Sequence, residues 1–190
     1  MPWKKHYVKY DHSFLSPSSY HWLNYDHEKL IKTYLNVMYS KAHGTEMHEL
    51  AKLLIKNRQE LPDEPKTFNM YVNDAIKYKM SPEVLLYYSD NCFGTADAII
   101  FDDKKRTLRI HDLKTGTIKA SMNQLKIYAA LFCLDYDVDP NALKNMTLQI
   151  YQNDEVSSEE PDASEISEIC DKIIEFDEVL ENLKEDLNNV

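Results

Sequence analysis

The chain has 190 residues, of which 43% are hydrophobic and 28% are charged, and its formal net charge at pH 7 is −10. This composition indicates a globular protein large enough to bury a core, and it excludes an intrinsically disordered chain. No apolar run reaches the roughly 18 residues that cross a bilayer, and the N-terminus lacks the apolar stretch of a secretory signal. We therefore expect a cytoplasmic protein without a membrane partner.

The expected helices come first in the chain, and most of the expected strands follow them. Helical spacing or capping residues predict four helices, over residues 14–25, 26–39, 43–61 and 66–80. Short apolar runs between turn residues then predict strands over 82–89, 94–102, 106–114 and, after a buried helix at 119–136, over 145–153. This order predicts an α/β (α+β) fold in which helices pack in layers against a sheet.

Negative charge is concentrated at the C-terminal end. Residues 154–190 carry 14 acids and 2 lysines, whereas residues 1–153 carry 18 acids and 20 bases. A body with a charge of +2 is compatible with a polyanionic partner despite the acidic total. We expect one domain over 1–153, followed by an acidic linker and an amphipathic helix over 154–190, with 153–165 as a flexible joint.

The C-terminal helix carries apolar residues in a heptad pattern. One row is Ile166, Ile173, Leu180 and Leu187, and the other is Ile169, Phe176, Leu183 and Val190. Such a pattern is typical of a seam between helices. Two interpretations remain: the helix lies on its own domain, or it joins a second copy or a partner protein.

The stretch from residue 94 to residue 116 places charged residues where strands are expected to be apolar. If the turn centres on Lys104 and Lys105, Ile99 lies opposite Ile110, Phe101 opposite Leu108 and Asp97 opposite Asp112. These residues then share one face with Lys114, while His111 points to the other face and has a structural role. Two neighbouring carboxylates repel each other unless a cation lies between them, so the pattern predicts a site for Mg²⁺ or Mn²⁺.

Two carboxylates that hold a divalent cation beside a lysine suit phosphodiester hydrolysis. The cation activates water, and the ammonium group neutralises charge that develops on the phosphate.

Four short motifs in this order resemble the PD-(D/E)XK nuclease superfamily, in its RecB-like and phage-type exonuclease branch. They are "GTEMHE" (44–49), "GTAD" (94–97), "DLKTG" (112–116) and "QLKIY" (124–128). The resemblance implies a restriction-endonuclease-like core with a central mixed sheet flanked by helices. It also implies three sets of site residues: the metal ligands His48, Asp97, Asp112 and the backbone carbonyl of Leu113; the catalytic Asp97, Asp112 and Lys114; and the substrate-binding Gln124 and Tyr128.

The function predicted from this resemblance is a Mg²⁺- or Mn²⁺-dependent DNA exonuclease of phage or mobile-element recombination. Its expected partner is linear DNA, and the C-terminal helix would mediate self-association or contact a recombination protein. Several relatives hold an iron–sulfur cluster with four cysteines, but only Cys92, Cys133 and Cys170 occur here, so no cluster is expected. The alternatives are an endonuclease or RNA-processing enzyme on the same core, and a DNA-binding adaptor without turnover.

Overall fold

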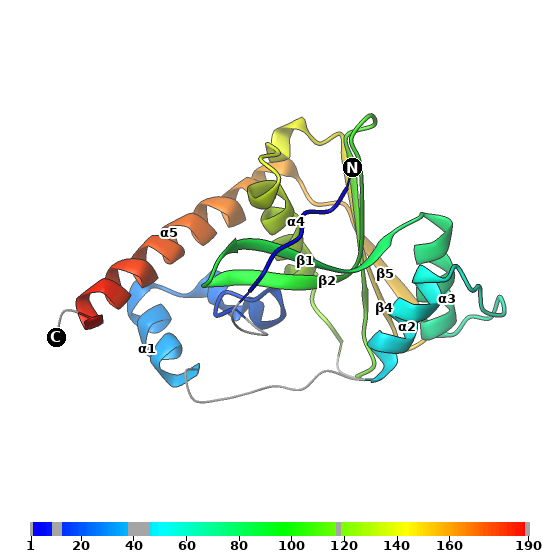
Figure 1. Ribbon diagram of the computed structural model, residues 1–190, viewed down its shortest axis with the longest axis horizontal. Helices are drawn as coiled ribbons and strands as arrows, with labels where there is room; N and C mark the ends of the chain where they lie inside the picture. The colour runs from blue at the N-terminus through cyan, green and yellow to red at the C-terminus, as the bar shows by residue number, and fades with distance from the viewer. Residues whose placement is uncertain (1, 9–12, 38–45, 117–118, 189–190) are drawn as a thin grey trace.

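A single mixed sheet forms the centre of the protein (Figure 1). The computed structural model describes residues 2–8, 13–37, 46–116 and 119–188. Strand order in the sheet follows the chain, and only β3 and β4 are parallel neighbours. The strands are β1 (Ser81–Ser89), β2 (Cys92–Asp102), β3 (Thr107–Leu113), β4 (Asn145–Gln152) and β5 (Glu155–Glu159).

Helices cover both faces of this sheet. In Figure 1, α2 and α3 lie on one side, and α4 and α5 lie on the other. The helices are η1 (Pro17–Asn24), α1 (His27–Val37), α2 (Glu46–Lys56), α3 (Thr67–Lys77), α4 (Asn123–Asp135), η2 (Pro140–Ala142) and α5 (Ala163–Asn188). Because β3 and β4 are parallel, the chain must cross over between them, and α4 is that crossover. No helix within the described ranges is both long and apolar enough to span a membrane.

Two hydrophobic cores lie on the two faces of the sheet. The core on the α4 side contains Ile99, Phe101, Leu108 and Ile110, so the predicted shared face of the hairpin is confirmed for these four apolar residues. The core on the α2–α3 side is smaller. On that side His111 lies against the rings of Tyr78 and Tyr151, in keeping with its predicted structural role. Most of α4 is buried, as its nearly uniform apolar character predicted.

The C-terminal region differs from the prediction in one element. The segment predicted as a flexible joint contains β5, which pairs antiparallel with β4 after a turn at Asn153 and Asp154. Both turn residues have positive φ, a conformation that asparagine and aspartate tolerate well. The prediction was wrong here because β5 is an exposed edge strand without the apolar alternation that marks a half-buried one.

The heptad residues of α5 pack against the rest of the same chain over most of its length. Ile166, Ile173, Phe176 and Leu180 are buried in the core on the α4 side. Leu187 is exposed, and Val190 lies outside the described residues. The packing therefore favours a helix that lies on its own domain over residues 166–180.

The first and third predicted helices differ from the structure in type and in extent, respectively. The segment predicted as a capped α-helix from residue 14 is the 3₁₀-helix η1, which begins at Pro17 and lacks a side-chain cap bond. The helix predicted over 43–61 spans Glu46–Lys56 and ends where Arg58 takes a positive φ. Gly44 and Thr45, which were expected to break the chain and cap that helix, lie outside the described residues.

Replacing Gly94 with alanine is expected to lower the free energy of unfolding by about 1–3 kcal/mol, because the position is overpacked. A Cβ atom there would lie 2.7 Å from Cδ of Pro17 and 3.1 Å from Cε1 of Tyr128. Gly116→Ala is the matched control, because nothing lies within 4 Å of its Cβ position. Urea denaturation of both variants measures the difference, and equal stabilities would contradict the expected close contact.

Candidate functional site

Asp97 lies where the β2–β3 ladder ends. The predicted pairs Ile99–Ile110 and Phe101–Leu108 are confirmed, and the last ladder pair is Ala98–His111, one short of the predicted Asp97–Asp112 pair. Beyond this pair, a side chain replaces the backbone acceptor: Oδ2 of Asp97 accepts a hydrogen bond of 2.9 Å from the backbone N–H of Leu113. The two aspartates thus belong to neighbouring strands that part at this point.

The alternation of side chains between the two faces of the sheet is also interrupted in β2 at Asp97. Ala96 packs in the core on the α4 side, whereas Ala98 packs in the core on the α2–α3 side. In a regular strand these two residues would share a face. The irregularity brings the Asp97 carboxylate within reach of α2 as well as of β3.

His48 and Glu83 complete a three-residue cluster with Asp97. His48 comes from α2, and its Nδ1 lies 3.3 Å from Oδ2 of Asp97. Glu83 comes from β1, and one potential ligand atom from each of the three residues lies within 4.8 Å of the others. This triad could hold a metal ion, and it brings together the predicted ligands His48 and Asp97.

Glu83 was not predicted from the sequence. A two-residue turn at Asp90 and Asn91 would set Glu83 opposite Ala98, on the next residue of β2. The register of β1 shifts between Tyr87 and Ser89, so Glu83 lies level with Asp97, between the pairs Pro82–Ala98 and Val84–Ala96. The sequence therefore shows the turn between β1 and β2, but it does not show the bulge that shifts the pairing of these strands by one residue.

Asp112 is the most deeply buried carboxylate of the group. Its side chain is 2% exposed, and Oδ2 accepts no well-aligned hydrogen bond from any residue the structure describes, although Nζ of Lys114 lies 3.1 Å away. Burial, followed by the charge of Asp97, raises the pKa of Asp112 to about 7. A buried carboxylate with so few partners is costly to ionise, so a cation bound beside Asp97 would stabilise its charged form together with Lys114.

The neighbouring groups show the same excess of negative charge. Burial and then the charge of Asp97 raise the pKa of Glu83 to about 6. The hydrogen bond with Asp97 raises the pKa of His48 despite the opposing effect of burial. Burial is the larger cause of the raised pKa of Asp112 and of Glu83, and the charge of Asp97 adds to it, so these carboxyl groups are harder to ionise than exposed ones. Carboxylate oxygens and one imidazole are a common set of donors for a divalent metal.

Lys114, Gln124 and Tyr128 lie on the α4 side of the site. Nζ of Lys114 donates a 2.7 Å hydrogen bond to Oε1 of Gln124. The hydroxyl of Tyr128 donates a 2.5 Å hydrogen bond to the carbonyl of Thr95. The predicted contact of Gln124 and Tyr128 with a substrate strand stays a prediction, as does the role of the Leu113 carbonyl as a ligand.

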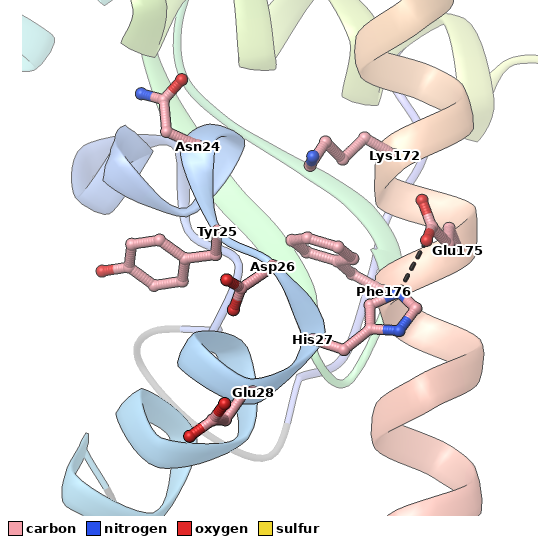
Figure 2. Close-up of a pocket in the computed structure, with 8 residues that line it drawn as sticks. All are labelled: Asn24, Tyr25, Asp26, His27, Glu28, Lys172, Glu175 and Phe176. Atoms are coloured by element: carbon pink, nitrogen blue, oxygen red, sulfur yellow. Dashed lines mark hydrogen bonds and ion pairs between the residues drawn. The ribbon is translucent and has the colours of Figure 1, made fainter.

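A separate hollow of about 770 Å³ lies between residues 24–28 and α5 (Figure 2). An ion pair of 2.6 Å between His27 and Glu175 crosses it. Both side chains are more than half exposed, at 57% and 55%, so solvent screens them. This hollow contains none of the residues of the Asp97 cluster and offers no comparably desolvated group.

Replacing Glu83 with glutamine is expected to weaken divalent-metal binding by about 10-fold to 100-fold, because one charged ligand is lost. The matched control is Glu49→Gln, since Glu49 is an exposed acid that pairs with Lys52 on α2. Isothermal titration with Mn²⁺ measures both affinities. Equal affinities of the two variants would remove Glu83 from the ligand set.

Comparisons with known proteins support a family but no activity. A family model described as "Protein of unknown function (DUF2800)" matches residues 83–185, a span that includes Glu83, Asp97, Asp112 and Lys114 but not His48. No curated protein matches the chain. A solved structure titled "Crystal structure of SSO0001" is similar at 15% identity, over 77% of this chain and 84% of that one, with a TM-score of 0.29. A TM-score of this size carries no argument about fold or function.

Proposed function

The chain belongs to the DUF2800 family of proteins of unknown function, and we propose that it is a metal-dependent nuclease that hydrolyses phosphodiester bonds. One observation carries the proposal. Asp97 joins His48 and Glu83 in one cluster and accepts a hydrogen bond from the N–H of Leu113, and the preceding residue, Asp112, is buried with its Oδ2 3.1 Å from Nζ of Lys114. Two carboxylates and an imidazole grouped within 4.8 Å, near a buried carboxylate that pairs with an ammonium group, suit a cation and a phosphate better than they suit an empty protein interior.

His48, Glu83 and Asp97 would hold the cation, and Asp112 is the adjoining carboxylate that completes its charge balance. Mg²⁺ or Mn²⁺ in this position supplies a Lewis acid and lowers the pKa of bound water. Within the chain, Lys114 holds a positive charge beside Asp112, where it can neutralise a non-bridging oxygen of the scissile phosphate as negative charge develops on it. Water adds to phosphorus, the bond from phosphorus to the leaving oxygen breaks, and the leaving oxygen takes up a proton.

The motif order supports nucleic acid as the substrate. The residues of "GTAD", "DLKTG" and "QLKIY" lie in the family-matched region, and they resemble motifs of the PD-(D/E)XK nucleases in their RecB-like branch. A restriction-endonuclease-like core within the mixed α/β fold belongs to the same proposal. By this resemblance we propose an exonuclease that acts on linear DNA, in phage or mobile-element recombination. An endonuclease, an RNA-processing enzyme and an adaptor without turnover are the outcomes that the following experiment separates.

The experiment incubates the purified protein with linear DNA, circular DNA and RNA of one sequence, in Mn²⁺, in Mg²⁺ and in EDTA. The expected result is metal-dependent degradation of linear DNA that Lys114→Ala lowers by about 10²–10³-fold. Lys119→Ala is the control, because Lys119 is an exposed lysine five residues further along the chain. Cleavage of circular DNA or of RNA would instead support the alternatives. Equal degradation by wild type and Lys114→Ala would show a contaminant, and binding without cleavage would support the adaptor.

A further inference from the structure

We propose that Gln124 and Tyr128 are positioning residues, which hold the two halves of the candidate site against α4 rather than contact the substrate strand. The inference rests on the proposed function, because it concerns how the same site is held together. In this proposal Gln124 positions the side chain of Lys114, and Tyr128 positions β2, the strand that carries Asp97. Each assignment follows from a hydrogen bond that the side chain already makes inside the protein.

Gln124 fixes the position of the Lys114 ammonium group. Lys114 follows the last residue of β3, and a lysine side chain at the end of a strand has many rotamers. The 2.7 Å hydrogen bond to Oε1 of Gln124 selects a rotamer in which Nζ lies 3.1 Å from Oδ2 of Asp112. Gln124 is 8% exposed, so little of its side chain is available to a ligand in solution.

Tyr128 fixes strand β2 just before Asp97. Its hydroxyl donates to the carbonyl of Thr95, two residues before the aspartate. The side chain is 5% exposed, and its ring lies so close to Gly94 that a Cβ atom there would be 3.1 Å from Cε1. A tyrosine in this setting has no free face on which a nucleotide could stack. Its contacts instead hold the backbone where β2 changes its facing.

A single helix makes both contacts, and that helix is rigidly held. Gln124 and Tyr128 are four residues apart, so they point from the same side of α4. Most other residues of α4 are buried in the core, which fixes the helix relative to the sheet. A site supported from one packed element keeps its geometry more closely than a site supported from loops. The helix therefore sets the separation between Lys114 and Asp97 before any substrate arrives.

A double-mutant cycle tests the role of Gln124. Gln124→Met keeps the size and removes the acceptor, and it is expected to lower kcat about 10-fold to 100-fold with KM unchanged. In a Lys114→Ala background the same change is expected to have almost no further effect, because the group that it positions is gone. Gln124→Glu keeps an oxygen acceptor and should restore most of the rate. Asn123→Ala is the control, because the hydrogen bond of the adjacent Asn123 to Oγ of Ser121 comes from its backbone N–H, which the substitution keeps.

Opposite results would identify a substrate contact and overturn the proposal. One such result is a raised KM for DNA in Gln124→Met or in Tyr128→Phe. The other is that Gln124→Met lowers kcat by the same factor in the wild-type and the Lys114→Ala backgrounds. Positioning by Tyr128 predicts that Tyr128→Phe lowers Mn²⁺ affinity, through the backbone next to Asp97, while KM for DNA stays unchanged.

A spectroscopic measurement separates failure of this inference from failure of the proposed function. In ¹⁵N-lysine-labelled wild-type protein, the Lys114 ammonium group is expected to give a resolved NMR signal, because its hydrogen bond slows exchange with water. The signal should disappear in Gln124→Met and persist in Asn123→Ala. This measurement needs no cleavage, so it tests whether Gln124 positions Lys114 even if the protein has no nuclease activity. An unchanged signal in Gln124→Met would overturn the positioning role.

Discussion

Replacing Asp97 with asparagine is expected to abolish divalent-metal binding and to lower the rate of DNA cleavage by at least about 10³-fold, or about 4 kcal/mol of activation free energy. Among the residues that the structure describes, Asp97 is the carboxylate that contacts both His48 and the Leu113 backbone, and its charge raises the pKa of Glu83 and of Asp112. Removing it takes away a shared ligand rather than a peripheral one. Calorimetric titration with Mn²⁺ and a cleavage assay on end-labelled linear DNA measure the two effects.

The same substitution is expected to leave the fold intact. The amide oxygen of asparagine can still accept the hydrogen bond from the N–H of Leu113, and the buried Asp112 loses a repulsive neighbour. The metal-free variant should therefore unfold at the same temperature as wild type or above it. Asp102→Asn is the matched control, because Asp102 ends the same strand at its exposed turn. A variant that folds normally and still binds Mn²⁺ with wild-type affinity would contradict the assignment of the metal to Asp97.

The hairpin that carries the two aspartates was predictable because its register follows from local features. A turn at Lys104 and Lys105 and the alternation of apolar residues suffice to pair Ile99 with Ile110. The departure at Asp97 was not predictable, because it arises where β2 leaves the ladder and contacts a helix distant in the sequence. His48 was identified only through its resemblance to a motif, since no local pattern connects α2 with β2.

Glu83 and Tyr128 show two other limits of the sequence. Glu83 has a φ of 53° within β1, and the shift in β1 that aligns it with Asp97 depends on tertiary packing rather than on turn residues. Tyr128 belongs to a motif that suggested contact with substrate, yet the helix that carries it is buried on almost every side. Sequence spacing shows that two residues share a helical face, but not whether that face meets solvent or a neighbouring strand.

The metal-free protein is expected to lose stability as the pH rises from about 4 to about 8, and Asp112→Asn is expected to lose much less. The pKa of Asp112 is raised from 3.8 to about 7 in the folded protein. A raised pKa means that the folded state binds the proton more tightly than the unfolded state does. The stabilising contribution is therefore complete below about pH 4 and disappears as the pH passes through 7, a change of about 4 kcal/mol.

Other groups titrate in the same range, so the comparison between the two proteins isolates Asp112. The pKa of Glu83 is raised to about 6 and adds a loss of the same sign. His111 acts oppositely, because burial lowers its pKa to about 3 and favours the folded state as the pH rises toward 6.5. The measurement is urea denaturation at intervals from pH 4 to pH 8 in the presence of EDTA. Asp63→Asn, which alters an exposed acid between α2 and α3, is the control for the change in net charge.

Mn²⁺ should reverse the loss at pH 8, because a cation held by His48, Glu83 and Asp97 offsets the negative charge of the neighbouring ionised Asp112. Asp112→Asn should gain less stability from the metal than wild type gains, although it is more stable without it. The two proteins thus exchange order when the metal is added. If wild type and variant instead showed parallel pH profiles, the Asp112 carboxylate would be well solvated. The electrostatic conflict on which the metal site and the nuclease proposal both depend would then be absent.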